Sequence, residues 1–125
     1  EEDRADGDEI VGDAGLNLAG MTTVSETAAV IARSRLVISG DSGVLHIAAG
    51  LDIPTVSLFG PSSAAKWAPQ GDRHVVMSRH LSCAPCSIFG TIPPCPIAAR
   101  CISAISPDEV IEAIGRLLSQ PPERI

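Results

Sequence analysis

The sequence predicts an α/β fold in which helices flank a parallel β-sheet. Hydrophobic residues make up 45% of the 125-residue chain, yet it contains only two Phe, one Trp and no Tyr, so the core must be aliphatic. Short, continuously apolar runs alternate with helix-like segments, which is typical of strands buried on both faces. The length suits one compact domain. Together these observations favour parallel strands joined by right-handed helical crossovers.

The first part of the chain is expected to form two helices. Residues 1–14 are predicted as an amphipathic helix, followed by a short strand at 16–18. Thr23 and Glu26 have the spacing of a capping box, in which a hydroxyl caps the helix and a carboxylate follows three residues later. A second helix is therefore predicted over 23–34. Its apolar stripe is predicted to be Val24, Ala28, Ile31 and Ala32.

Three buried strands follow, with one helix between the first two. The apolar runs predict strands at 36–38, 55–59 and 74–77. The intervening helix is predicted over 44–51 and is closed by the turn at 52–54. Its core stripe is predicted to be Val44, Ile47, Ala48 and Leu51.

The last helix has the clearest start signal in the chain. Ser106 is a predicted N-cap, Pro107 occupies the first helical position, and Glu109 supplies the acid three residues after the cap. The buried face of this helix is predicted to be Val110, Ile111, Ile114, Leu117 and Leu118.

The predicted topology places two polar loops at one edge of the sheet. Ligands of open parallel sheets bind beyond the carboxyl ends of the strands. Residues 40–43 and 59–63 follow successive strands, so both loops are expected at that edge, where they could flank one crevice.

The first of these loops opens a helix and has the features of an anion site. Backbone N–H groups at a helix start lack internal partners and carry part of the helix dipole, which suits a phosphate. Gly43 allows close approach, Ser42 adds a hydroxyl, and His46 shares their helix face and can donate to a phosphate. The alternative is an ordinary N-cap with a half-buried histidine.

Charge and hydropathy exclude several classes of function. The net charge is −6, whereas a general nucleic-acid binder usually carries a basic stripe, so no nucleic-acid partner is expected. No apolar run approaches the roughly 18 residues of a membrane span, and no signal-peptide pattern is present. Because the sequence lacks an initial Met and opens within a predicted helix, we expect a piece of a longer, cytoplasmic protein.

Several motifs together resemble one known family. The run DSGVLHIAA at 41–49 fits the pattern D-[ST]-G-x-x-H-[LI]-A-A, and Pro54 and LFGPS at 58–62 fit the segments that follow it. The loop at 18–23, the Cys-x-x-Cys motif and the tail around 105–110 fit as well. In these features the chain resembles the C-terminal domain of the glycosyltransferase family that includes the ADP-heptose:lipopolysaccharide heptosyltransferases.

The resemblance implies a fold and a set of binding residues. The fold would be the Rossmann-like C-terminal domain of a glycosyltransferase-B enzyme without its first strands, with residues 1–125 as a partial donor-binding domain. The pyrophosphate of an ADP-sugar would be held by Ser42, Gly43, Val44, Leu45 and His46. Asp41 would orient the turn or meet sugar hydroxyls, Met21 and Thr22 would lie near the adenine, and Glu2 near the ribose.

The resemblance also implies an inverting sugar transfer in bacterial lipopolysaccharide synthesis. The catalytic base and the contacts to a glycolipid acceptor would lie in an N-terminal domain that this chain lacks, so the chain alone is expected to be inactive. No cofactor is required by this scheme, and no carboxylate pair suggests Mg²⁺. Lys66 is a candidate second cation at the cleft, with an exposed surface lysine as the alternative. The enzyme could act at the inner face of the membrane.

Four cysteines, Cys83, Cys86, Cys95 and Cys101, lie within a Pro-rich loop over residues 81–105. They could bind a structural Zn²⁺ tetrahedrally, although the second pair is separated by five residues rather than two to four. Disulfides and free thiols are the alternatives. The cluster is interpreted as structural, because no helix is predicted to start there and lower a thiol pKa.

Two further functions stay open from the sequence. The chain could be a zinc-stabilised interaction module without catalysis, or a domain similar to that of a nucleotide-sugar epimerase. Binding of ADP against UDP, and metal analysis of the purified protein, would separate these alternatives from the transferase.

Overall fold

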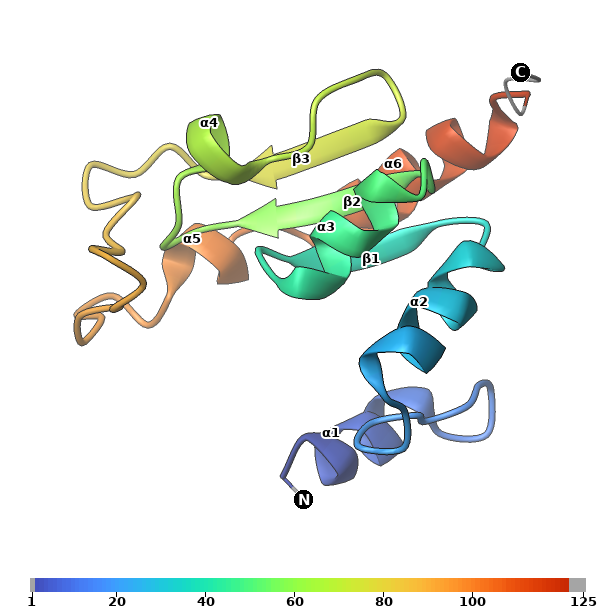
Figure 1. Cartoon of the computed structure of the whole chain (residues 1–125). Coiled ribbons are helices and arrows are strands. Elements are labelled where there is room, and N and C mark those ends of the chain that lie inside the picture. The colour runs from blue at the N-terminus through green and yellow to red at the C-terminus, as the bar shows by residue number, and fades with distance from the viewer. Residues whose placement is uncertain (1, 122–125) are drawn as a thin grey trace.

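The computed structural model of the chain describes residues 2–121 and contains one small parallel sheet with helices around it (Figure 1). The strands are β1 (Val37–Gly40), β2 (Thr55–Phe59) and β3 (His74–Ser78). The helices are α1 (Glu2–Val11), α2 (Val24–Ala32), α3 (Gly43–Gly50), α4 (Ala64–Trp67), α5 (Arg100–Ser103) and α6 (Pro107–Ser119). The α/β class and the three strands are as predicted, but only β2 is buried; Ile38 of β1 and Val76 of β3 are exposed because these strands form the two edges of the sheet.

The sheet has the order β1-β2-β3, and both neighbouring pairs are parallel. Val37 of β1 lies opposite Thr55 of β2, which in turn lies opposite His74 of β3. The carboxyl ends of the strands therefore meet at one edge, hereafter the carboxyl edge, and the loops after β1 and β2 both begin there, as the sequence predicted.

Helices α3 and α6 cover opposite faces of the sheet (Figure 1). The core on the α6 side is formed by Val56 of β2 together with Ala113 and Leu117. The predicted buried face of α6 is correct for Leu117 but wrong for Ile111, which is 63% exposed. Ala113 takes its place because a small residue lets the helix approach the sheet closely.

The buried face of α3 differs from the predicted stripe. Leu45 and Ala48 are fully buried, whereas Val44 and Leu51 are exposed. Helix α3 packs against β1, β2 and α2 together, and these elements meet it on the side of Leu45. The prediction is therefore correct for Ala48 and wrong for Val44 and Leu51, because the buried face is rotated round the helix towards Leu45.

The region before β1 departs furthest from the predictions. Ile31 of α2 is buried, but Val24 is 77% exposed because the start of α2 extends beyond the sheet towards α1 (Figure 1). The strand predicted at 16–18 does not form. The side-chain amide of Asn17 donates instead to the carbonyl of Arg4 and to the Asp8 carboxylate, both at 2.8 Å, and ties this loop to α1.

Two short helices, α4 and α5, were not predicted. Helix α5 packs against the end of β2, where a Cβ added to Gly60 would lie only 2.8 Å from the Sγ of Cys101. Glycine is therefore required at this close approach. Between 81 and 99 the chain is irregular, as expected, apart from an isolated bridge between Ile88 and Thr91. Within residues 2–121, no helix has both the length and the apolar character needed to cross a bilayer.

Candidate functional site

The candidate site begins where β1 leads into α3. Ser42 is the N-cap of α3, with an extended backbone, but its hydroxyl forms no cap hydrogen bond with the helix. The Ser42 Oγ lies 2.9 Å from the Oγ of Ser39 instead, and these two hydroxyls share a hydrogen bond. Residues 41–44 are exposed, so the first N–H groups of α3 face solvent without a side-chain cap. These donors are available to an external acceptor.

His46 stands beside this open helix start. Its Nε2 lies 3.4 Å from an Oδ1 of Asp41, and its backbone N–H donates to the carbonyl of Ser42 at 3.4 Å. The side chains are 46% and 23% exposed for His46 and Asp41, respectively. The imidazole is thus anchored by a carboxylate on one side while it still reaches solvent.

Helix α4 brings two more side chains to the same place. The indole of Trp67 meets the imidazole of His46 edge to face, with 6.4 Å between ring centres and 66° between ring planes. The Nζ of Lys66 lies 4.8 Å from the centre of the Trp67 ring. Asp41, His46, Lys66 and Trp67 are hereafter called the edge cluster. It places one cation and one ionisable ring near the open end of α3.

The structure places the residues of the predicted phosphate-binding segment at the open start of α3, with one exception. Leu45 is fully buried, backbone included, so it cannot contact a ligand. The reason is the rotation of α3 described above. Lys66 is exposed, and its Nζ lies over the Trp67 ring; this exposure agrees with both interpretations of Lys66, a second cation at the cleft or a surface lysine.

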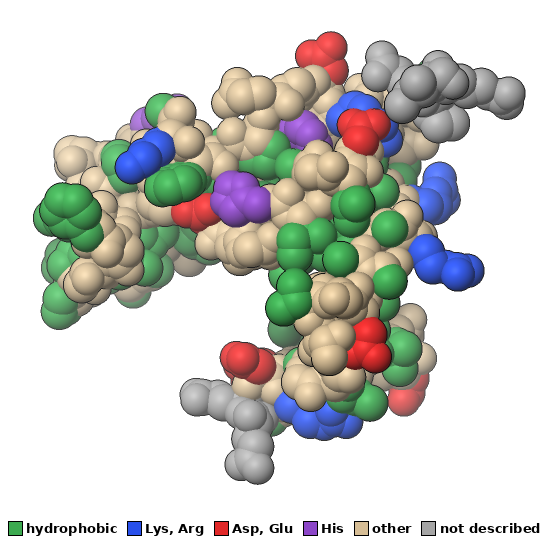
Figure 2. Space-filling model, in the orientation of Figure 1, with side chains coloured by type: hydrophobic (Ala, Val, Ile, Leu, Met, Phe, Trp, Pro, Cys, Tyr) green, Lys and Arg blue, Asp and Glu red, His purple; other side chains and the backbone are tan. Residues whose placement is uncertain are grey.

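The predicted adenine-binding residues lie elsewhere on the surface. Thr22 Oγ1 shares a 2.9 Å hydrogen bond with Thr27 Oγ1, and Met21 is exposed. Both precede α2, and among the described residues no hydrogen bond or ion pair joins them to 41–46. Figure 2 shows the surface hollowed between the α1 segment and the loops at the carboxyl edge. Glu2 begins α1, but its side chain lies outside the described residues.

The second predicted loop forms a separate, small cavity. It has a volume of about 170 Å³ and lies at the carboxyl ends of β2 and β3, with Ser62, Ser63, Ser78 and His80 among its lining residues. Residues 41–46 do not line it. The two loops thus share an edge, as predicted, but the structure does not join them in one crevice.

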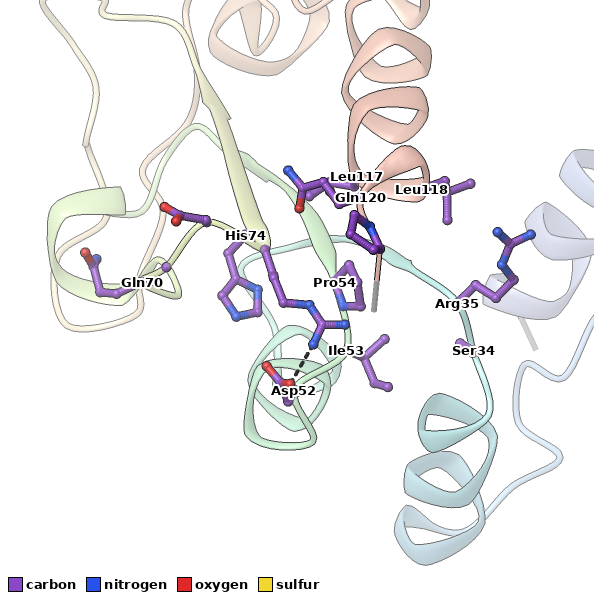
Figure 3. A pocket seen from close by; sticks show the side chains of 14 residues that line it. Ser34, Arg35, Asp52, Ile53, Pro54, Gln70, His74, Leu117, Leu118 and Gln120 are labelled. Atoms are coloured by element: carbon purple, nitrogen blue, oxygen red, sulfur yellow. Dashed lines mark hydrogen bonds and ion pairs between the residues drawn. The ribbon is translucent and has the colours of Figure 1, made fainter. Parts of the chain in front are cut away.

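Another cavity lies at the opposite, amino edge of the sheet. It measures about 760 Å³, and Asp52, Pro54, His74 and Leu117 are among its lining residues (Figure 3). Arg73 donates to Asp52 at 2.6 Å, so its cation is already paired, and the Nδ1 of His74 shares a 2.9 Å hydrogen bond with Thr55. Partial burial lowers the pKa of His74, which disfavours a charged ring. These pairings reduce the positive charge that the cavity offers an anion, although Arg35 also lines it.

The four cysteines form no disulfide in the described structure, and the zinc alternative stays a prediction. All four are free thiols; Cys101 is buried against the end of β2, and the Sγ of Cys95 accepts from the N–H of Ala99 at 3.2 Å. Among residues 2–121, no group of three or more His, Cys, Asp or Glu side chains is arranged to hold a metal ion. The irregular, Pro-rich loop spreads the four residues instead of gathering them.

Sequence reasoning missed two residues of this region. Trp67 belongs to a four-residue helix, which is too short to show periodicity. Ser39 lies within β1, one residue beyond the strand predicted at 36–38, and it was given no role. The one available signal for Trp67 was its composition: it is the single tryptophan of a chain almost without aromatics.

Comparison with known proteins gives a consistent result. The family model described as glycosyltransferase family 9 (heptosyltransferase) matches residues 2–92. Lipopolysaccharide heptosyltransferase 1 of Pseudomonas aeruginosa is 41% identical over 71 residues, which cover 57% of this chain and 18% of that protein. Lipooligosaccharide heptosyltransferase 2 of Campylobacter jejuni is 33% identical over 103 residues, covering 81% of this chain and 31% of that protein.

A solved structure extends the similarity to the fold. The structure of E. coli ADP-heptose lps heptosyltransferase II matches with a TM-score of 0.69 and 28% identity, covering 94% of this chain and 34% of that chain. The present chain therefore spans about a third or less of the length of the relatives it matches.

Proposed function

This chain belongs to glycosyltransferase family 9, the heptosyltransferase family, and we propose that it binds the nucleoside diphosphate of a sugar donor at the carboxyl edge. The observation that carries this proposal is the uncapped start of α3 with His46 beside it. The proposed donor is an ADP-sugar, because the E. coli relative is named for ADP-heptose.

The open amides are suited to the pyrophosphate. Gly43 and Val44 are exposed at the helix start, where the macrodipole places partial positive charge on their N–H groups. The first turn of α3 contains no acidic residue, although Asp41 lies just before the N-cap. A Cβ added to Gly43 would meet nothing within 4 Å, so the space beside this residue is free.

The edge cluster adds side-chain charge to this backbone site. Because Nε2 of His46 faces Asp41, the ring can meet a phosphate through its charge when protonated, or through its other nitrogen. The ammonium of Lys66 supplies a second positive group. Asp41 holds the imidazole in place. Because Asp41 lies in the turn before α3, its carboxylate could also accept hydrogen bonds from sugar hydroxyls.

In the whole enzyme, these groups would stabilise the leaving group of an inverting transfer. An acceptor hydroxyl of a lipopolysaccharide-type glycolipid would attack the anomeric carbon, and the bond to the diphosphate would break. The negative charge that grows on the diphosphate would be met by the amides and His46. The base that takes the hydroxyl proton is proposed to lie in the part of the enzyme outside this chain.

The proposal requires no metal ion, because amides, imidazole and ammonium already supply positive charge to the diphosphate. Chelation with EDTA is expected to leave nucleotide affinity unchanged; a loss of affinity that Mg²⁺ restores would contradict this part of the proposal. With a glycolipid acceptor, the proposed place of action is the cytoplasm, at the inner face of the membrane.

Calorimetry on the full-length protein that carries this chain tests the proposal. ADP is expected to bind more tightly than UDP, and much more tightly than adenosine, which lacks the diphosphate. The variant His80→Ala is a matched control, since His80 is an exposed histidine that lines the separate small cavity. Absence of binding by both ADP and UDP would show that the proposed function is wrong.

A further inference from the structure

Trp67 has a position that its burial does not explain. It is the last residue of the four-residue helix α4, and its side chain is 48% exposed. Its neighbours Ala65 and Lys66 are exposed as well, so α4 contributes little to the core. A large aromatic side chain usually contributes by burying area, which this one does only in part. The contacts that Trp67 makes at the surface therefore indicate a role other than core packing.

Trp67 makes one contact with α3 and one contact within α4. The 6.4 Å separation and 66° angle to His46 lie within the preferred edge-to-face range for aromatic pairs, and link α4 to α3. The ammonium of Lys66 lies 4.8 Å from the ring centre, within the distance of a cation–π contact. One indole thus touches both side chains of the edge cluster that can carry positive charge.

The contacts restrict two side chains that would otherwise be mobile. Lysine and an exposed histidine lose rotamer freedom when they are fixed by a ligand, and this loss weakens binding. His46 is contacted by both Asp41 and Trp67, and the same indole lies under the ammonium of Lys66. The entropy loss is then largely complete before the ligand arrives.

We propose that Trp67 is a positioning residue: its indole holds the imidazole of His46 and the ammonium of Lys66 where both meet the donor diphosphate. This inference rests on the proposed function. Trp67 itself need not touch the ligand, and it acts through the two groups that it orders.

The experiment compares Trp67→Ala with Trp67→Phe in the full-length protein. Calorimetry with ADP and with adenosine gives the two affinities, and NMR follows the imidazole protons of His46. Trp67→Ala is expected to weaken ADP binding about 3- to 10-fold and to leave adenosine binding unchanged. It should also shift the His46 resonances, because the ring current is lost. Trp67→Phe should restore most of the ADP affinity. Phe89→Ala, which removes a fully exposed aromatic ring, is the control.

The outcomes separate this inference from the function beneath it. The positioning role is wrong if Trp67→Ala weakens ADP and adenosine binding equally, leaves ADP binding unchanged, or leaves the His46 resonances unshifted. In each of these cases the proposed function still stands, provided that the wild-type protein binds ADP. A Phe variant no better than Ala would overturn the positioning role as well. If the wild-type protein binds neither ADP nor UDP, the proposed function fails and the inference fails with it.

Discussion

Helices α3 and α6 both begin after a serine, yet one start is open and the other is closed. At α6, the Ser106 hydroxyl accepts from the N–H of Glu109, and the Glu109 carboxylate accepts from the N–H of Ser106 at 2.8 Å. Arg79 pairs with the same carboxylate at 2.6 Å. At α3, the hydroxyl of Ser42 is turned to Ser39, and the first amides receive no side-chain cap.

The residue three positions after the cap accounts for the difference. It is Glu109 in α6, which completes a capping box, and Leu45 in α3, which is buried in the core and cannot reach back. Helix α2 repeats the closed arrangement with Thr23 and Glu26. Helices α2 and α6 are thus capped by their own side chains, whereas the starts of α3 and of the short helices α4 and α5 have no side-chain cap hydrogen bond. Of these three, the start of α3 is the one that we propose for the ligand.

The largest expected effect comes from removing the imidazole at the open start. His46→Ala should weaken ADP binding roughly 10- to 100-fold, because a hydrogen bond or ion pair to a charged group contributes about 1.5–3 kcal/mol. Adenosine binding should change little. Calorimetry on both ligands measures the contrast, with His80→Ala as the control. An equal loss for ADP and adenosine would contradict the role given to His46.

A methyl group in front of the amides should act next most strongly. The Cβ of Gly43→Ala would lie in open space, so the stability of the fold should be preserved. It would crowd the approach of a phosphate, and the loss of one charged hydrogen bond predicts roughly 10-fold weaker ADP binding. Calorimetry and urea unfolding give the two quantities. Unchanged ADP affinity would show that no ligand approaches these amides.

Replacing the N-cap serine with alanine should destabilise the protein more at α6 than at α3. Ser106→Ala should lower the free energy of unfolding by about 1 kcal/mol, because an N-cap hydrogen bond is lost. Ser42→Ala should cost only about 0.5 kcal/mol or less, since its hydroxyl caps nothing. Urea unfolding of the two variants measures this difference. Equal losses would contradict the contrast between α3 and α6.

The smallest expected effect is a pH dependence of stability that arises from the capped start of α6. The pKa of Glu109 is lowered from 4.5 to about 2, first by the guanidinium of Arg79 and then by hydrogen bonds from Ser106. Its contribution to stability is therefore full above pH 4.5 and is lost as the pH falls towards 2. Glu109→Gln should flatten the acid-induced fall of stability in that window. A variant with the wild-type pH profile would rule out this source of acid sensitivity.

How far the sequence could predict these features depends on the range of the interactions. The caps at Thr23 and Ser106 were predicted because a capping box is read within four residues, and β2 because it is a short segment between the turns at Pro54 and Gly60. The buried side of α3 was predicted correctly at Ala48 but missed Leu45, because α2 and two strands together set the rotation of the helix. A local pattern does not contain that information.

The candidate site shows the same division. The open amides and His46 follow from the Asp-Ser-Gly turn after a strand, so the sequence identified them. The meeting of His46 with Trp67 joins residues 21 positions apart through the loop after β2, and no local pattern predicts it. The zinc alternative came from cysteine spacing alone, which does not contain the path of the loop; within residues 2–121 that path does not gather three or more potential metal ligands.

The most direct test follows the backbone amides themselves by NMR during titration with ADP. The N–H resonances of the exposed Gly43 and Val44 should move strongly with ADP and hardly at all with adenosine, while those of Asp108 and Glu109 at the closed start of α6 should stay in place. If the α3 amides do not respond to ADP, or respond no more than those of α6, the open start of α3 is not the diphosphate site.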